Sequence, residues 1–232
     1  MFGVCRARDK MNYIIPLLMI IPGVYEEPMH LADSMSRQKY VKPVIRYDQA
    51  SITYDELLDQ AVVNCKNAKP ENIDYDLLDK LVEIEKKYSP PPELRGMILA
   101  AACQESGFNP KARGDHKFSK SGKKPLAHGL FQMWPWWENP KGYAVDRDDP
   151  IQSAEAWIKH ITKQIKHIKR TCNYKTQKRI WIAAWVRAIR APKEGGRCLE
   201  VPRHYRLLKR WHKNILHIKK IKKECEIDGC GC

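Results

Sequence analysis

The chain has 232 residues, a length that predicts one domain of ordinary size with extensions and argues against two full domains. Hydrophobic residues make up 43% of it, which is enough for a packed core and excludes disorder of the whole chain. Lys and Arg number 42 and Asp and Glu 27, so the net charge is +15. This excess predicts attraction to polyanions such as nucleic acid, anionic lipid or an acidic wall polymer, and charge alone does not distinguish them.

Residues 1–25 resemble a secretory signal or a membrane anchor. Basic residues precede an almost wholly apolar run from Tyr13 to Tyr25. That run is too short to span a bilayer, which takes about 20 apolar residues, whereas a basic flank and a short apolar core are typical of export signals. No small-residue cleavage site follows, so an uncleaved anchor and a buried helix or strand are the alternatives. We expect an exported protein that is periplasmic, envelope-associated or secreted, with a virion as an alternative location.

Eight cysteines fit an exported protein with disulfides, because such proteins fold where thiols are oxidised. They are Cys5, Cys65, Cys103, Cys172, Cys198, Cys225, Cys230 and Cys232. Their pairing does not follow from the sequence. The last three lack the paired Cys-x2-Cys spacing of zinc sites, so we expect no metal there, with zinc held by these cysteines and His212 or His217 as the alternative.

The apolar periodicity, caps and breakers predict helices along most of the chain after residue 50. The first three are expected at 54–64, from a cap at Asn72 or Asp74 to just before Pro90, and from Pro92 to about Ser106. The last three are expected from Pro150 through Ile168, at about 177–190, and from about His204 past Ile218. A polar stretch from Ala112 to Gly129 reads as a long loop. No strand-length alternating run is present, so the domain is predicted to be mainly α.

We divide the chain into four parts on these grounds. Residues 26–71 are expected to form a linker and a helical N-terminal extension, residues 72–215 the main domain, and residues 216–232 a basic, cysteine-containing tail. The segment of residues 1–25 precedes them.

Glu105 is the acidic residue whose place in a helix suggests chemistry. Met97, Ile98, Ala101 and Ala102 form an apolar face, and Glu105 follows the alanines by three to four positions. The spacing predicts a carboxyl on the buried face at the C-terminal end of the helix. Burial and the helix dipole there both disfavour the anion, and a carboxyl kept protonated can serve as a general acid. A Glu that points into solvent, or that pairs with a Lys or Arg, is the alternative.

Two motifs around this residue resemble those of the soluble lytic transglycosylases. Residues 104–112, QESGFNPKA, resemble the Glu-Ser motif, and residues 129–135, GLFQMWP, resemble the Gly-Leu-Met-Gln motif with Phe131 in place of Met. Asp149 and Pro150 resemble the Asp-Pro that opens the next family helix. The resemblance covers about residues 72–211 and implies a lysozyme-like fold and cleavage of peptidoglycan glycan strands.

The resemblance also implies roles for single residues. Glu105 becomes the catalytic acid and later the base, Ser106 orients local groups, and Gln132 and Met133 line the cleft. Phe131 and Trp134 belong to the same motif and are expected to contact substrate. The family's Ala-Tyr-Asn-Ala-Gly motif is present only as residues 184–188, AWVRA, in which Trp185 can replace the aromatic surface. Glu200 and Tyr205 resemble the family's closing Glu-…-Tyr element.

The family's reaction implies that one carboxylate suffices, unlike the pair that most glycosidases use. Glu105 would protonate the oxygen of the β-1,4 bond between MurNAc and GlcNAc, assisted by the substrate's acetamido group. It would then take the proton of the 6-hydroxyl, which closes a 1,6-anhydro ring without water or cofactor. Hydrolysis, as in lysozymes, is the alternative, and Asp115 is then the candidate to hold a water, unless it is an ordinary turn residue.

The remaining features concern binding. Trp134, Trp136 and Trp137 follow the second motif, and a sugar's flat apolar face suits such rings, one or two of which are expected to face the groove. The basic segments 159–170 and 203–223 are expected to attract anionic envelope polymers, or else form a solvated face. A catalytically silent polyanion-binding protein is the third hypothesis. We expect no specific nucleic-acid partner. We expect the protein to be a monomer.

Overall fold

The computed structural model describes residues 49–118, 124–141, 143–189, 198 and 200–227, all within the unit Val44–Cys232. The expected signal or anchor and most of the linker lie outside these residues. The described part is mainly α, as predicted. Its α-helices are α1 (Tyr54–Asn64), α2 (Tyr75–Tyr88), α3 (Met97–Ser106), α4 (Pro150–Thr171), α5 (Gln177–Ile189) and α6 (Arg203–Ile227). Because α6 continues to Ile227, the boundary expected at residue 215 lies inside this helix.

The helix starts follow from capping residues. Thr53 and Glu56 form a capping box at α1, Asp74 accepts a hydrogen bond from the Leu77 N–H at α2, and Asp149 accepts from two backbone N–H groups at α4. Each cap satisfies donors that the first turn of a helix leaves unpaired. Of the two predicted caps of α2, Asn72 and Asp74, the structure uses Asp74, and α4 opens at Asp149 and Pro150 as predicted.

The third helix starts later than the sequence predicts. Pro92–Leu94 forms a short 3-10 helix, and Gly96 then adopts a left-handed conformation with φ +84°. That conformation interrupts the helical path, so α3 begins at Met97 and not at Pro92.

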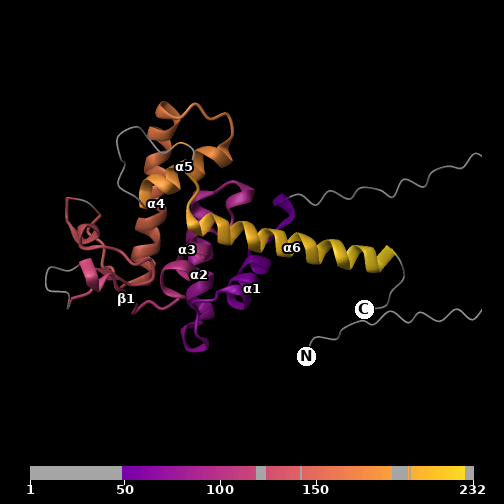
Figure 1. The fold of residues 1–232 in the computed structure, drawn as a ribbon, viewed down its shortest axis with the longest axis horizontal. Coiled ribbons are helices and arrows are strands. Elements are labelled where there is room, and N and C mark those ends of the chain that lie inside the picture. The colour runs from indigo at the N-terminus through magenta and orange to yellow at the C-terminus, as the bar shows by residue number, and fades with distance from the viewer. Residues whose placement is uncertain (1–48, 119–123, 142, 190–197, 199, 228–232) are drawn as a thin grey trace, which may run out of the picture. The chain divides into compact units, whose positions relative to one another are not determined.

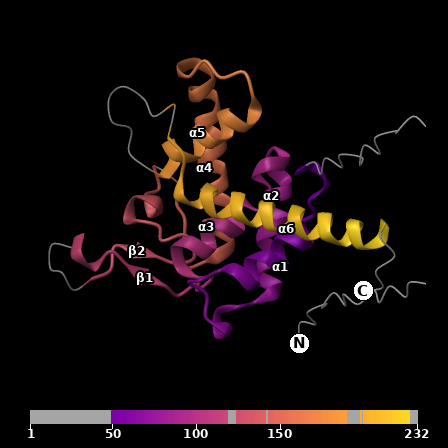
Figure 2. The ribbon, with the colours of Figure 1, turned by 45° about the vertical axis from the view of Figure 1, so that its right-hand side comes forward.

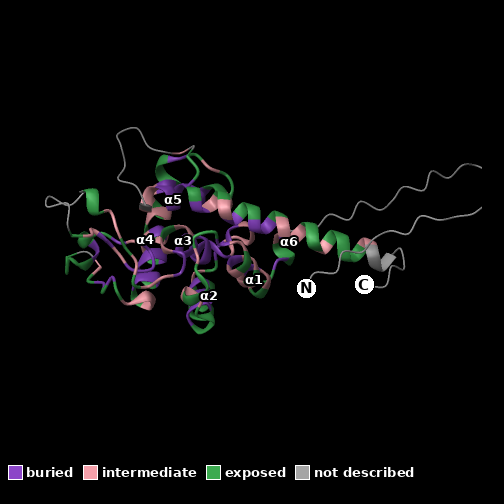
Figure 3. Ribbon diagram, turned by 60° about the horizontal axis from the view of Figure 1, so that its bottom comes forward, coloured by how far each residue is buried: buried purple, intermediate pink, exposed green. Residues whose placement is uncertain are grey.

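Helix α3 lies at the centre of the fold, in contact with α1, α2 and α6 (Figures 1 and 2). Every residue from Met97 to Cys103 is buried, which explains why this helix is apolar on all sides up to its last turn. Helices α4 and α5 pack against each other, and α2 joins them to the centre. Figure 3 shows buried, half-buried and exposed residues alternating along α6 where it passes α3, and mostly exposed residues toward its C-terminal end.

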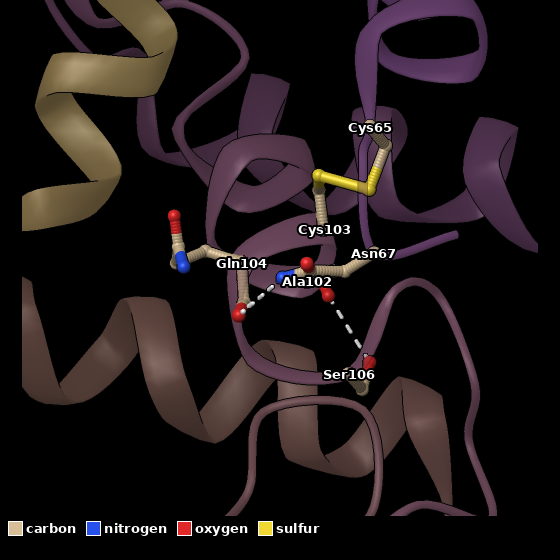
Figure 4. Close-up of a disulfide and its surroundings, with 6 residues drawn as sticks. All are labelled: Cys65, Asn67, Ala102, Cys103, Gln104 and Ser106. Carbon is tan, nitrogen blue, oxygen red and sulfur yellow. Dashed lines mark hydrogen bonds between the residues drawn. A yellow bond between two sulfur atoms is a disulfide. The ribbon is translucent and has the colours of Figure 1, made fainter.

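Among the described residues, two disulfides close the helical framework. Cys65–Cys103 ties the end of α1 to α3 (Figure 4), and Cys172–Cys198 ties the end of α4 to the segment before α6. Both fit the expected export, and neither pairing followed from the sequence. The side chains of the cysteines near the C-terminus lie outside the described residues.

The stretch predicted as a loop between α3 and α4 contains a small sheet. Strands β1 (Arg113–Gly114) and β2 (Ala127–His128) pair antiparallel, with Arg113 opposite His128. Two-residue strands are too short to produce an alternating pattern in the sequence. Within the described ranges, no helix combines the length and apolarity needed to cross a membrane.

Candidate active site

A cavity of about 480 Å³ opens beside the C-terminal end of α3. Side chains from α3, α4, α5, α6 and the segment between α3 and α4 meet there. The lining residues are Glu105, Asp115, Phe131, Gln132, Met133, Trp134, Trp136, Trp137, Trp157, His160, Ala188 and His204. Six of the ten site residues predicted from the sequence thus line one cavity: Glu105, Asp115, Phe131, Gln132, Met133 and Trp134.

Glu105 lies in the last turn of α3, where the helix emerges from the core. Its side chain is 36% exposed, so the prediction that its carboxyl is buried is wrong. The helix ends at Ser106, and the turn that carries Glu105 therefore faces the cavity and not a neighbouring helix. Oε1 lies 2.6 Å from Nε2 of His204, which is 5% exposed. The structure thus leaves the carboxyl exposed to the cavity and gives it a buried histidine partner.

The backbone that carries Glu105 is held from several sides (Figure 4). Cys103 is bonded to Cys65, and the Asn67 side-chain amide donates to the Gln104 carbonyl at 3.3 Å. Gly107 caps the helix with φ +60°, and a Cβ there would lie 2.0 Å from the Asn67 carbonyl oxygen. Only glycine tolerates both the conformation and the approach. The C-terminal end of α3, which carries Glu105, is therefore held against the segment that follows α1.

Ser106 serves this local structure and does not line the cavity. Its hydroxyl donates to the Ala102 carbonyl at 3.0 Å, inside the last turn of α3.

The second motif forms the cavity wall opposite the helix end. Phe131 and Met133 are nearly fully buried, and the Gln132 side chain donates to the Gly129 carbonyl at 2.9 Å. Gly129 has φ +73°, and a Cβ on it would lie 2.0 Å from the Arg147 carbonyl oxygen. Arg147 is buried and donates hydrogen bonds to the Leu126 and Met133 carbonyls. The sequence motifs did not point to this residue. A buried arginine thus fixes the motif's backbone.

The tryptophans after the motif differ in exposure. Trp134 and Trp136 are 38% and 47% exposed, whereas Trp137 is 6% exposed and stacks on Trp136 with ring centroids 4.3 Å apart. Exposed aromatic faces on a cavity rim suit the apolar faces of sugar rings. His160 of α4 lies beside them and bonds the Tyr143 hydroxyl. Burial lowers the pKa of His160.

Asp115 lines the same cavity from the segment after β1. Its Oδ2 accepts a hydrogen bond from Trp134 Nε1 at 2.9 Å, and its backbone is left-handed with φ +57°. The aspartate thus holds one of the two exposed tryptophans.

Three further residues predicted to bind substrate do not reach the cavity. Trp185 is fully buried and stacks on His204, so it supports the histidine from behind. Tyr205 is half-buried against the core, because consecutive helix positions are about 100° apart and the cavity takes His204 instead. Glu200 is exposed and does not line the cavity. In the part of the chain that the structure describes, no group of three His, Cys, Asp or Glu could hold a metal ion.

A helical domain with a glutamate and exposed tryptophans in one cavity is typical of enzymes that act on glycans. Residues 80–191 match the family model of the transglycosylase SLT domain, and searches of curated proteins and of solved structures found no match. Residues 80–191 are therefore a transglycosylase SLT domain with the lysozyme-like fold, which makes the protein a transglycosylase-type enzyme whose domain acts on peptidoglycan outside the cytoplasm. His204 lies beyond the matched residues.

Proposed function

We propose that this protein cleaves the β-1,4 bond between MurNAc and GlcNAc in peptidoglycan, with Glu105 as general acid and then base. The observation that carries the proposal is the position of the Glu105 carboxyl: it is exposed in a tryptophan-lined cavity and sits in the family's first motif. Among the described residues, its Oε1 bonds His204 and its Oε2 has no hydrogen-bond partner. One oxygen is thus held and the other is available to a substrate.

The cavity supports a transglycosylase reaction that ends in an anhydro sugar. Glu105 protonates the glycosidic oxygen, and the acetamido oxygen of MurNAc bonds to its anomeric carbon as the glycosidic bond breaks. The carboxylate then takes the 6-hydroxyl proton, and the 6-oxygen displaces the acetamido oxygen to close the 1,6-anhydro ring. The two exposed tryptophans would hold the sugar rings, and Gln132 and Met133 would line their path.

Hydrolysis is the second candidate, and Asp115 is the observation that favours it. It lies in the same cavity, and while Oδ2 accepts the Trp134 N–H, Oδ1 has no hydrogen-bond partner among the described residues. That oxygen could hold the attacking water of a lysozyme reaction.

Mass spectrometry of the fragments released from purified sacculi separates the candidates. Anhydro-muramyl ends are expected, and Asp115→Asn should leave them as the product. Reducing ends that disappear in Asp115→Asn would establish hydrolysis instead. Release of no fragments by folded protein would favour the third hypothesis, a silent polyanion-binding domain.

We further propose that α6 holds the enzyme to anionic envelope polymers after export. Arg206, Lys209, Arg210 and Lys213 line one shallow cavity of about 420 Å³ with Leu216 and Gln49, and none of the four forms an ion pair with a described residue. Salt should weaken binding to sacculi, because exposed charges are screened. Replacing the four cations with Gln should remove that salt dependence and leave the fragments unchanged.

A further inference from the structure

The partner of Glu105 is held more rigidly than Glu105 itself. His204 lies in the first turn of α6, and its imidazole stacks on the fully buried indole of Trp185 with centroids 5.7 Å apart and planes 13° apart. Glu105 is a longer side chain and 36% exposed. The packed ring has less room to move than the exposed carboxyl, so the 2.6 Å contact is one through which the ring can position the carboxyl.

The surroundings of the ring indicate which nitrogen carries the proton. Nδ1 of His204 is buried and has no hydrogen-bond partner among the described residues. A proton on Nδ1 would be a buried, unpaired donor, which costs about 1–3 kcal/mol. With the proton on Nε2, the ring donates to Oε1 of Glu105 and Nδ1 needs no acceptor.

We propose that His204 is a positioning residue for Glu105, whose Nε2–H occupies Oε1 so that Oε2 carries the catalytic proton. This inference rests on the proposed function of Glu105. It extends the site beyond the matched SLT residues, since His204 follows their end at residue 191.

The proton balance of the reaction is consistent with this role. In the first step the Oε2 proton moves to the glycosidic oxygen, which leaves with the electron pair of the broken C–O bond as the acetamido oxygen attacks. Glu105 becomes a carboxylate, and the Nε2–H bond to Oε1 becomes charge-assisted and hence roughly twice as strong. In the second step the 6-hydroxyl proton returns to Oε2. His204 keeps its own proton throughout, and its bond is strongest where charge develops, which is the condition for acceleration.

Two amide substitutions separate the hydrogen bond from the packing. In His204→Gln the amide nitrogen is as many bonds from Cα as Nε2 of histidine, so it can reach Oε1. In His204→Asn the amide nitrogen is only as many bonds from Cα as Nδ1 of histidine, so it cannot reach Oε1 of Glu105. Both variants lose the stacking on Trp185, so they should have similar melting temperatures.

His212 provides a matched control on the same helix. It is 1% exposed, its Nδ1 is also buried without a partner among the described residues, and its Nε2 bonds the Arg95 carbonyl at 3.0 Å. It resembles His204 in burial but bonds the backbone and not a carboxyl. His212→Asn should therefore lower the melting temperature and leave kcat unchanged.

The experiment measures kcat and KM on soluble glycan strands for these variants and for Glu105→Gln. We expect His204→Asn to lower kcat about 100-fold with little change in KM, as for loss of one preorganised donor. His204→Gln should recover most of that loss. Equal kcat in the two variants, or a wild-type kcat in His204→Asn, would overturn the role of His204 and leave the proposed function standing if Glu105→Gln is inactive. Activity in Glu105→Gln would overturn the proposed function itself.

A spectroscopic measurement serves if His204→Asn does not fold. Nitrogen NMR of labelled histidine in the wild-type protein should show the His204 proton on Nε2, with a resonance that moves in Glu105→Gln. A proton on Nδ1 would contradict the proposal.

Discussion

Two glutamates lie at opposite ends of α3, and they are held in opposite ways. Glu85 of α2 is fully buried at the N-terminal end, where it accepts hydrogen bonds from the Gly96 N–H at 2.6 Å and the Ile98 N–H at 2.8 Å. Glu105 is exposed at the C-terminal end and bonds one histidine side chain. Glu85 satisfies donors that the start of α3 would otherwise leave unpaired.

The comparison shows that burial and a shifted pKa do not by themselves identify a catalytic carboxyl. Burial raises the pKa of Glu85 to about 7, yet Glu85 lies outside the cavity and its partners are backbone groups and the Tyr54 hydroxyl. Structural networks shift pKa values as active sites do. What distinguishes Glu105 is its access to a cavity and a histidine side chain as its partner.

The largest expected effect is that of exchanging each carboxyl for an amide. Glu105→Gln should lower the rate of sacculus clearing about 10²- to 10⁴-fold, because a general acid–base group is lost. Its stability should be unchanged, since the side chain is partly exposed. Glu85→Gln should retain activity and lose about 1–3 kcal/mol of stability, because one buried acceptor becomes a donor. Turbidity and thermal unfolding check both variants, and a stability loss confined to Glu105→Gln would refute the contrast.

The two glycines that flank α3 should also differ in their effect on activity. Substitution of Gly107, beside Glu105, should lower kcat, whereas substitution of Gly96 at the Glu85 end should not. Gly107→Ala places a Cβ 2.0 Å from the Asn67 carbonyl oxygen, so the backbone beside Glu105 must move. We expect about 4 kcal/mol of lost stability together with lower kcat. At Gly96 a Cβ would meet only side-chain carbons at 3.3 Å, so Gly96→Ala should cost about 1 kcal/mol for its positive φ and leave kcat intact. Urea unfolding and kinetics of the pair test this, and equal kcat values would contradict it.

Glu85 should also make the stability of the protein depend on pH, with no direct effect on activity. Its pKa is raised from 4.5 to about 7, so the folded protein binds a proton that the unfolded chain has lost between these values. The stabilisation is therefore full below about pH 4.5 and declines as the pH rises to about 7, by about 3 kcal/mol in total.

The control for this prediction is the difference between wild type and Glu85→Gln across the same pH range. His160 and His212, whose pKa values burial lowers, act in the opposite direction and are present in both proteins. Urea midpoints should show the difference shrinking with rising pH. A constant difference would mean that Glu85 does not titrate in this range.

Much of the fold follows from local sequence. The starts of α1, α2 and α4 and the end of α3 are set by Thr53, Asp74, Asp149 and Gly107, which act on backbone groups a few residues away. Local rules failed at Pro92, because Gly96 interrupts the helix, and at the two-residue strands, which have no detectable period. Glu105 and Gln132 were identified by motif, and the assignment of their roles stays a prediction.

What the sequence by itself determined is the mainly helical fold and the place of Glu105 at the end of a helix, because capping and apolar periodicity operate over one or two turns. The tertiary structure decided what surrounds that residue. It exposed Glu105, buried Trp185, turned His204 and not Tyr205 toward the cavity, and paired the cysteines. These outcomes depend on how α3 and α6, whose residues 105 and 204 are 99 positions apart, pack against each other. A one-residue rotation of α6 would have presented tyrosine instead, and no local pattern encodes that choice.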